Sequence, residues 1–219
     1  MLFAFALPIV YNVMLSFEQT SPATIANFTA PFAGLDNYRF ILNDPTTAYF
    51  RELVVRWFQF AAFCPLFRLH GVREPGPLVG SGQTGAPNEV WSFGDEAYGL
   101  IRKQLAVRER IRPYVMDQMA TASATGLPPM RALFLEFPEE AQAWEVSDQY
   151  MFGPDVLVAP VTALGARERD VYLPVGASWL DAWTGKTVEK NGWVTAAAPL
   201  ERIPVYLRAG GSVKDFSDA

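Results

Sequence analysis

The residue types best suited to covalent or metal chemistry occur once each. The 219-residue chain has a single cysteine, Cys64, and a single histidine, His70, six positions apart. A nucleophilic Cys–His pair needs direct hydrogen-bond contact, whereas we expect these two residues to lie apart along one extended segment. The apolar run around Cys64 (FCPLF) would also raise a thiol pKa. We therefore expect Cys64 to be a packing residue, and no ligand spacing predicts a metal site or a cofactor.

The charge pattern excludes several classes of partner. Lys and Arg number 18 and Asp and Glu number 23, giving a net charge of −5 with no basic run, so nucleic acid is not an expected partner. The Gly- and Pro-rich segment 76–90 holds no GxGxxG or Walker-type string, so phosphate binding is not predicted. A single cysteine cannot form a disulfide within the chain, which favours a reducing compartment and a cytoplasmic location for the part from residue 51.

Apolar periodicity predicts a helix just before the histidine. The helix is expected from Glu52 to Phe63, with Pro65 ending it. A short extended piece, Leu66 to His70, would follow. The apolar stripe of the predicted helix is formed by Leu53, Trp57, Phe60 and Cys64.

A longer helix is predicted from Asp95 to Thr125. Gly126 is a suitable stop, and Pro113 within the pattern predicts a kink or a break. We expect one run of charges on this helix to form a solvated face: Arg108, Glu109, Arg110 and Arg112.

Short apolar runs separated by Gly, Pro and Asp predict strands after Pro129. Their regular spacing is typical of an antiparallel sandwich. The predicted strands are 130–137, 150–152, 156–161, 170–173, 178–182, 192–196 and 203–208. Asp148, Asp155 and Asp181 fall between or at the ends of these runs, where Asp commonly stabilises turns.

The first 17 residues are uncharged and apolar. A membrane-spanning helix needs about 20 apolar residues, so this segment is short for one. No Lys or Arg precedes the apolar run and no A-x-A-like site follows it, so it is a poor signal peptide. Pro8 within it is tolerated better in a membrane helix than in a soluble one.

Residues 1–50 resemble the beginning of a sugar-transport permease of the ATP-binding cassette type. The resemblance rests on Pro8, on Ser16-Phe17, on the string GLDNY at residues 34–38 and on Asp44-Pro45. It implies a truncated membrane-type helix followed by a loop, with membrane contact through residues 1–17. Transport would need several helices around one site, so no transport activity is expected from a single one.

Residues 51–213 resemble the C-terminal part of the family 31 α-glycosidases, the α-glucosidases and α-xylosidases. The resemblance rests on motifs that occur in the family's order: the run Phe67-Arg68-Leu69-His70-Gly71, then Arg73-Glu74-Pro75, RPYV at 112–115, QYMFGPDVLVAPV at 149–161, YLP at 172–174 and DAWTG at 181–185. It implies the last part of a (β/α)8 barrel over 51–126 and a C-terminal β-sandwich over 127–219. The switch of resemblance near residue 50 suggests either a fusion of two neighbouring genes or a mis-assembled sequence.

The resemblance implies one site residue and no catalytic residue. In relatives the His of the F-R-x-H-G pattern hydrogen-bonds the sugar, so His70 is the candidate substrate-binding residue. The two catalytic Asp of the family lie in strings upstream of this part, and neither string is found here. Asp95, in Gly94-Asp95, follows the His instead of preceding it, so the acid role is not transferred to it.

The expected fold is therefore mixed α and β: the incomplete end of a (β/α)8 barrel, then an antiparallel β-sandwich, with an N-terminal apolar helix. The expected function is that of the C-terminal fragment of a retaining α-glycosidase acting on α-linked xylosides or glucosides, inactive by itself. Two alternatives stay open: a glycosidase completed by another chain, and a non-catalytic, membrane-tethered sugar-binding module. An incomplete barrel exposes faces meant for its neighbours, so self-association is expected.

Overall fold

The computed structural model describes residues 45–69 and 89–217, with the backbone alone given for residues 45–50. The predictions made for residues 1–44, including the apolar helix and the permease-like loop, lie outside the described residues. His70 and the loop that follows it lie outside them too. Among the described helices, none is long and apolar enough to cross a membrane.

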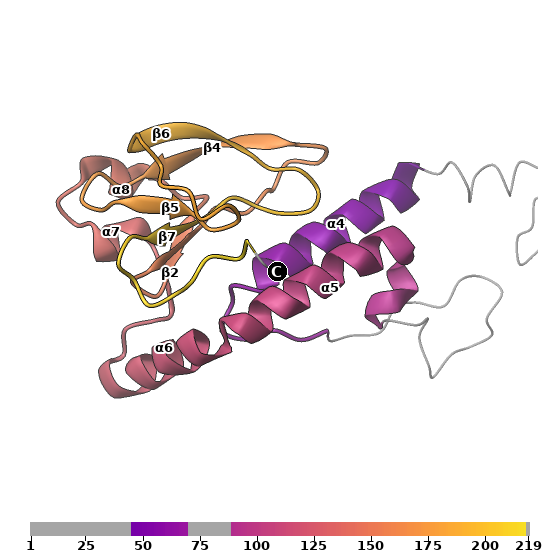
Figure 1. The fold of residues 1–219 in the computed structure, drawn as a ribbon, viewed down its shortest axis with the longest axis horizontal. Helices are drawn as coiled ribbons and strands as arrows, with labels where there is room; N and C mark the ends of the chain where they lie inside the picture. Colours follow the sequence, from indigo (N-terminus) through magenta and orange to yellow (C-terminus); the bar gives the residue numbers. More distant parts are fainter. Residues whose placement is uncertain (1–44, 70–88, 218–219) are drawn as a thin grey trace, which may run out of the picture. The chain divides into compact units, whose positions relative to one another are not determined.

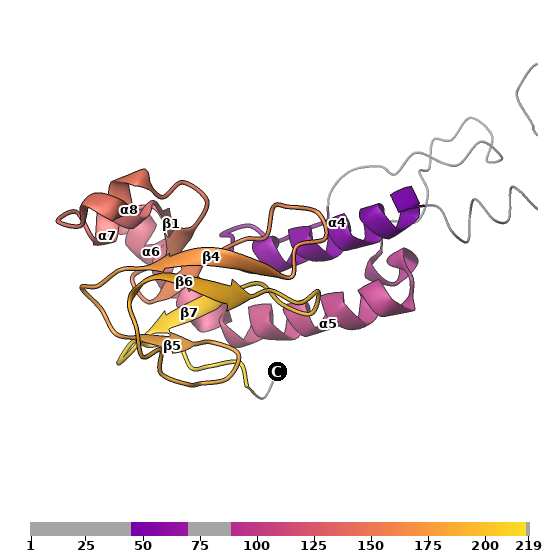
Figure 2. The same cartoon turned by 90° about the horizontal axis from the view of Figure 1, so that it is seen from above.

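Three helices begin the described part. Helix α4 runs Pro45–Ala61, the short 3-10 helix η1 runs Val90–Phe93, and α5 runs Asp95–Arg110. Figures 1 and 2 both show α4 and α5 side by side. Their contact is a small apolar core in which Val55 and Phe58 of α4 meet Ala97 and Ile101 of α5.

The predicted break of the long helix is confirmed. Helix α5 ends at Arg110, and α6 runs Arg112–Thr125 with Pro113 in its first turn. Proline is well accommodated there because the first-turn N–H groups have no partner within a helix. Gly126 ends α6 in the left-handed conformation, with φ 79°, a conformation that glycine adopts without steric cost.

The C-terminal part holds two antiparallel sheets. Five strands form one sheet in the order β1-β2-β3-β7-β5, and β4 pairs with β6 in the other. The strands are β1 Met130–Arg131, β2 Tyr150–Phe152, β3 Val156–Val158, β4 Glu168–Leu173, β5 Trp179–Asp181, β6 Gly192–Ala197 and β7 Val205–Arg208. Two short helices, α7 Leu133–Glu136 and α8 Ala141–Glu145, join β1 to β2.

One predicted strand is wrong. Residues 130–137 were expected to be extended, but only Met130 and Arg131 pair in the sheet, and α7 follows. The two deeply buried apolar side chains of this stretch, Leu133 and Phe137, stand four residues apart. That spacing places both on one side of a helical turn.

Both faces of the five-stranded sheet are covered, which explains why its central strands are apolar throughout. Side chains alternate across a strand. Val156 and Val158 of β3 join the core shared with α5 and α6, whereas Leu157 joins the core shared with β4 and β6. Figure 1 shows the corresponding layers: the helices, the larger sheet, and β4 with β6.

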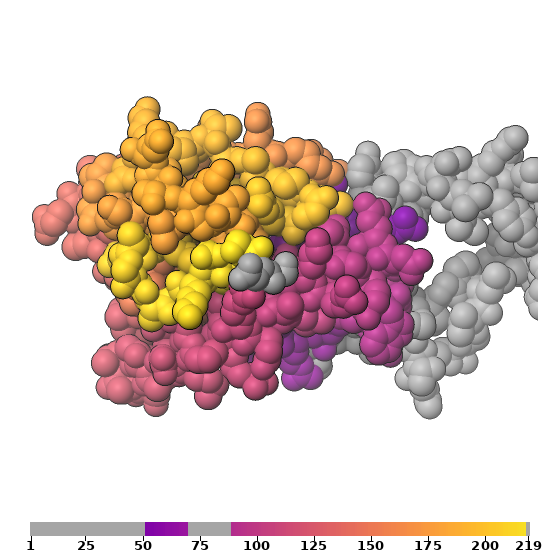
Figure 3. Space-filling view, viewed as in Figure 1, coloured from indigo at the N-terminus to yellow at the C-terminus, as the bar shows by residue number. Residues whose placement is uncertain are grey.

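The C-terminal segment closes the core between sheet and helices. Phe216 is buried and its ring lies 6.0 Å from that of Phe63 and 5.3 Å from that of Trp183, centroid to centroid. Arg110 donates a hydrogen bond to the carbonyl oxygen of Asp215. Figure 3 shows this yellow segment between the strands and the helices.

Buried polar side chains also join the helices to the sheet region. Arg56 and Gln59 of α4 and Gln104 of α5 all donate to backbone carbonyls of the 198–202 loop, which connects β6 to β7. Arg56 donates in addition to the carbonyl of Ala166 and to the side chain of Gln59. The two terminal nitrogens of the Arg56 guanidinium make these hydrogen bonds, while its Nε has no partner among the described residues. Hydrogen bonds offset much of the cost of burying a charge, so these contacts fix α4 against the C-terminal part.

Candidate functional site

The segment that leads to His70 is held between α4 and α5, although His70 itself lies outside the described residues. Residues 66–69 form neither helix nor strand. The ring of Phe67 meets that of Phe58 edge to face, with centroids 5.8 Å apart, and the guanidinium of Arg108 lies 5.8 Å from the Phe67 centroid. The approach to His70 is therefore anchored on both helices.

Arg108 fixes the turn between α4 and this segment. Its guanidinium donates hydrogen bonds to the carbonyl oxygens of Ala62, Cys64 and Pro65, at 2.9, 2.6 and 2.9 Å. These carbonyls follow the last turn of α4, where a helix lacks partners of its own and favours a cation. Burial lowers the pKa of Arg108, whose ordinary value is high enough to keep it charged at neutral pH. The sequence prediction that Arg108 belongs to a solvated face is therefore wrong.

The single cysteine is a partly buried packing residue. Cys64 is partly buried and its Sγ lies 3.5 Å from the carbonyl oxygen of Phe60. Burial raises the pKa of the Cys64 thiol to about 11, so it is protonated at neutral pH. Because the thiolate is the nucleophilic form, this environment suits a packing role.

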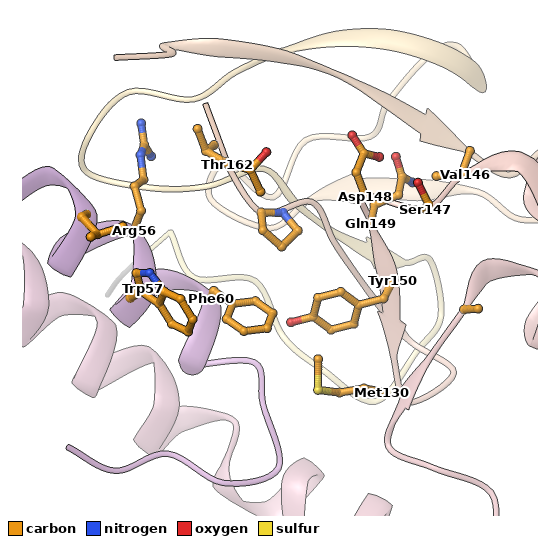
Figure 4. Close-up of a pocket in the computed structure, with 14 residues that line it drawn as sticks. Arg56, Trp57, Phe60, Met130, Val146, Ser147, Asp148, Gln149, Tyr150 and Thr162 are labelled. Carbon is orange, nitrogen blue, oxygen red and sulfur yellow. The ribbon is translucent and has the colours of Figure 1, made fainter. Parts of the chain in front are cut away.

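A groove of about 710 Å³ lies between α4 and the strands, and Figure 4 shows the side chains that line it. We call it the α4–β2 groove. Trp57 and Phe60 of α4 meet edge to face with centroids 6.2 Å apart, and Phe60 meets Tyr150 of β2 at 6.0 Å. The remaining lining residues are Leu53, Arg56, Met130, Ala132, Val146, Ser147, Asp148, Gln149, Pro160, Val161 and Thr162.

The main polar side chains of this groove are already engaged elsewhere. Gln149 pairs with the backbone of Tyr172 through both of its amide atoms, at 2.6 and 2.9 Å. Arg56 directs its guanidinium to the 198–202 loop. Asp148 forms an ion pair of 2.7 Å with Arg169. The wall of the groove is therefore mainly aromatic and aliphatic, and these three polar side chains are paired with other groups of the chain.

The other aspartates singled out from the sequence have structural roles. Asp181 accepts hydrogen bonds from the backbone N–H groups of Trp183 and Thr184, and Asp155 accepts from the backbone and hydroxyl of Ser212, as expected of turn residues. Asp95 is exposed at the first residue of α5. Within residues 51–69 and 89–217, no three His, Cys, Asp or Glu side chains are grouped to hold a metal ion.

Two sets of hydrogen bonds could not be predicted from the sequence. Arg56 and Arg108 both donate to backbone carbonyl oxygens, which every residue carries, so the residue types near them give no sign of the contact. Their position in the sequence could have indicated these contacts. Each arginine lies on a predicted helix next to an apolar stripe, where a long side chain can extend into the protein interior.

Two family models together match most of the chain. The TIM-barrel domain of glycosyl hydrolases family 31 matches residues 14–118, and the C-terminal domain of glycosyl hydrolase family 31 matches residues 126–213. The barrel match thus reaches into the segment that resembles a permease. No comparison supports that permease resemblance.

Curated relatives and solved structures agree with these matches. An α-xylosidase of Saccharolobus solfataricus is 33% identical over 82% of this chain and 23% of its own length. An α-glucosidase 2 of Bacillus thermoamyloliquefaciens is 32% identical over 74% of this chain and 19% of its own. The crystal structure of a family 31 α-xylosidase from a soil metagenome, complexed with xylose, is 48% identical over 75% of this chain and 25% of its own, with a TM-score of 0.69.

The chain spans about a quarter or less of the length of these relatives. Within that span α4 and α5 lie in the barrel match, and all seven described strands lie in the match to the C-terminal domain. The chain therefore belongs to glycosyl hydrolase family 31.

Proposed function

We propose that this chain is the C-terminal portion of an α-glycosidase acting on α-xylosides or α-glucosides. The observation that carries the proposal is the structural match to an α-xylosidase at 48% identity, which covers three-quarters of this chain. The contacts among the described residues are suited to stabilising one side of a larger enzyme. Arg56 and Gln59 fix α4 to the C-terminal part, and Arg108 fixes the segment that leads to His70.

Hydrolysis would need residues from elsewhere. A retaining glycosidase uses two carboxyls about 5–5.5 Å apart, one as nucleophile and one as acid and base. The described carboxylates discussed above serve a helix start, turns and an ion pair. We infer that the catalytic pair belongs to upstream parts of a complete enzyme, that this chain is inactive alone, and that His70 contacts the sugar.

A graft tests this proposal. Residues 51–213 would replace the matching segment of the soil-metagenome α-xylosidase, and hydrolysis of p-nitrophenyl α-xyloside would be measured. We expect an active graft and an inactive 219-residue chain. His70→Ala in the graft should lower kcat/KM by about 100-fold or more, the size of loss that follows removal of one hydrogen-bond donor to a transition state. A folded graft without hydrolysis would contradict the proposal.

A second candidate is a sugar-binding module without catalysis. The observation that favours it is the exposure of large aromatic side chains, such as Trp57 and Trp144, at 62% and 58%. Flat rings of this kind stack on sugar faces. Calorimetric titration with isomaltotriose, with His70→Ala as the comparison, separates the two functions: a chain that shows no saturable heat is not such a module.

We also propose that the isolated chain self-associates, and that its glycosidase-like part works in the cytoplasm. Leu66 is 83% exposed and Met116 is 63% exposed, and such apolar side chains favour association. The free Cys64 suits a reducing compartment. Membrane contact through residues 1–17 stays a prediction. Sizing chromatography without detergent tests the first point, and a clean monomer would contradict it.

A further inference from the structure

The turn that follows α4, residues 62–65, has all of its backbone polar groups hydrogen-bonded. The N–H groups of residues 62–64 donate to carbonyl oxygens in the last turn of α4, at 3.0 Å each, and Pro65 has no N–H. The carbonyl oxygens of all four residues accept hydrogen bonds from side chains of other elements. Ala62 and Phe63 are fully buried, and buried backbone groups need such partners.

Two side chains from distant parts of the sequence supply these hydrogen bonds. Arg108 of α5 donates to three of the four carbonyls. The hydroxyl of Tyr150 in β2 donates to the remaining one, the carbonyl of Phe63, at 3.1 Å. Helix α5 lies in the barrel match and β2 lies in the match to the C-terminal domain. The turn is therefore held from both of the domains that the family models distinguish.

The surroundings of Tyr150 fix its hydroxyl as a hydrogen-bond donor. Figure 4 shows the side chain directed from β2 toward Phe60 of α4, and the centroids of the two rings lie 6.0 Å apart. Burial raises the pKa of Tyr150 above its ordinary 10.0, and the neighbouring Cys64 thiol raises it further. The hydroxyl therefore keeps its proton at neutral pH and can donate it to the Phe63 carbonyl.

The 62–65 turn leads directly into the segment 66–69. Within that segment Phe67 is held by the ring of Phe58 and by the guanidinium of Arg108, each 5.8 Å from the Phe67 centroid. Leu69 stands four positions after Pro65. Because consecutive Cα atoms are only about 3.8 Å apart, a shift of the turn is passed along the segment to Leu69.

We propose that Tyr150 and Arg108 are positioning residues for glycoside hydrolysis, and that the C-terminal domain takes part in the reaction through Tyr150. Both side chains fix the carbonyls of the 62–65 turn, and through the turn they fix the segment that ends at Leu69, the residue before His70 in the sequence. A displacement of about 1 Å can lower the rate of an enzyme about 100-fold. This inference rests on the proposed function and adds to it a role for the C-terminal domain.

Tyr114 provides a matched control for a purely structural role. Its buried hydroxyl donates to a backbone carbonyl as well, that of Phe152 at 2.9 Å, and it accepts a hydrogen bond from the N–H of Asp155. Tyr114→Phe therefore removes at least as many hydrogen bonds as Tyr150→Phe. It leaves the four carbonyls of the 62–65 turn with their partners.

Kinetics of the graft with p-nitrophenyl α-xyloside test the positioning role. Tyr150→Phe should lower kcat about tenfold with little change in KM, because a shifted segment disturbs alignment in the transition state more than binding of the ground state. Tyr114→Phe, measured well below its thermal midpoint, should leave kcat and KM unchanged. Equal losses of kcat in the two variants would overturn the proposal.

Hydrogen exchange followed by mass spectrometry tests the same contact in the 219-residue chain without any activity. Tyr150→Phe should speed exchange of the amide hydrogens of residues 63–69 about fivefold, the effect of losing one hydrogen bond between neutral groups. Tyr114→Phe should leave exchange of these amides unchanged. Unchanged exchange in the Tyr150→Phe chain would overturn the proposal.

Arg108→Lys covers the case in which Tyr150→Phe does not fold. Lysine keeps the positive charge but lacks the planar fork that reaches three carbonyls. It should therefore speed exchange of the same amides and lower kcat of the graft. A graft with Arg108→Lys that keeps the kcat of its parent would overturn the proposal.

The two measurements separate this inference from the proposed function. A folded graft without hydrolysis contradicts the proposed function, and exchange in residues 63–69 then judges the positioning by itself. An active graft whose kcat is unaffected by Tyr150→Phe and by Arg108→Lys contradicts the positioning role and supports the function. Faster exchange together with a lower kcat in both variants is the result that we expect.

Discussion

Arg56 of α4 donates a hydrogen bond of 2.8 Å to the carbonyl oxygen of Ala198, 142 residues later in the chain. The same guanidinium reaches the carbonyls of Ala166, Pro199 and Arg202. Burial lowers the pKa of Arg56, and the nearby carboxylate of Glu52 opposes that shift. One buried cation thus joins the region matched to the barrel domain with the region matched to the C-terminal domain.

Replacing Arg56 by Leu should destabilise the chain strongly. Several carbonyls would lose a charged donor, and hydrogen bonds to charged groups contribute about 1.5–3 kcal/mol each without being additive, so we expect a loss of about 3 kcal/mol in the free energy of unfolding. Urea denaturation measures it. Arg112→Leu is the matched control, because that side chain is 69% exposed in its pair with Glu109 and such pairs contribute about 0–1 kcal/mol. Equal effects of the two substitutions would contradict the role given to Arg56.

Gly153→Ala should be more damaging than Gly126→Ala, although both glycines have positive φ, 61° and 79°. A Cβ at Gly153 would stand 2.2 Å from the hydroxyl of Tyr114, whereas one at Gly126 meets nothing within 4 Å. The Tyr114 hydroxyl donates to the carbonyl of Phe152 and accepts from the N–H of Asp155. The left-handed backbone alone costs a non-glycine residue about 1–2 kcal/mol, so Gly126→Ala should lose about that much.

Thermal denaturation of both glycine variants checks this order. Gly153→Ala should reduce the free energy of unfolding by at least about twice as much as Gly126→Ala, because the clash also breaks two hydrogen bonds that contribute about 1 kcal/mol each. Equal thermal midpoints for Gly153→Ala and Gly126→Ala would contradict this order. They would mean that the loop around Tyr114 adjusts to the added methyl group without a loss of stability.

Local features of the fold could be predicted from sequence, and long-range ones could not. The break at Pro113 and the stop at Gly126 depend on the backbone of single residues, and both are confirmed. The sequence identified the helix from the stripe of Leu53, Trp57, Phe60 and Cys64, whereas the side of α4 that the structure buries most deeply carries Val55 and Phe58 and continues into Ala62. The pattern contains two apolar stripes, and the choice between them depends on α5 and on carbonyls of the 198–202 loop.

The candidate site shows the same difference between local sequence features, which could be predicted, and long-range contacts, which could not. Motif order predicted the family, which the comparisons confirm. Arg108 was assigned to a solvated face because it stands in a run of charges, but its partners are the carbonyls of Ala62, Cys64 and Pro65. Only the folded turn brings those oxygens together, so residue types could not reveal the contact. The role of His70 stays a prediction.

Alkaline pH should destabilise the chain from about pH 9 upward. Burial raises the pKa of Cys64 from 9.0 to about 11, and it raises the pKa values of Tyr114 and Tyr150 above their ordinary 10.0. The folded state therefore keeps protons that the unfolded state releases. The contribution of the Cys64 thiol to the free energy of unfolding is therefore fully present below pH 9 and is lost as the pH rises through 11.

Urea midpoints at pH 7, 9, 10 and 11 measure the alkaline effect. Cys64→Ala should reduce the fall between pH 9 and 11, and the remaining fall belongs to the tyrosines. An unchanged midpoint across this range would contradict the burial of these groups.

Arg108 should control the accessibility of Cys64 through geometry more than through charge. Its guanidinium holds the carbonyls of Ala62, Cys64 and Pro65 around the thiol, and its positive charge by itself lowers the Cys64 pKa. Loss of the charge alone would therefore slow modification of Cys64 by a maleimide, because less thiolate would be present. Loss of the hydrogen bonds would open the turn and speed it.

Arg108→Ala and Arg108→Lys separate these two effects. Lysine keeps the charge but lacks the planar fork that reaches three carbonyls, so we expect both variants to react about tenfold faster than the parent chain, the change produced by losing roughly 1.4 kcal/mol of local stability. Arg102→Ala, on the exposed face of the same helix, should react like the parent chain. A slower Ala variant beside an unchanged Lys variant would mean that charge dominates, and the segment leading to His70 would then be positioned without the hydrogen bonds of Arg108.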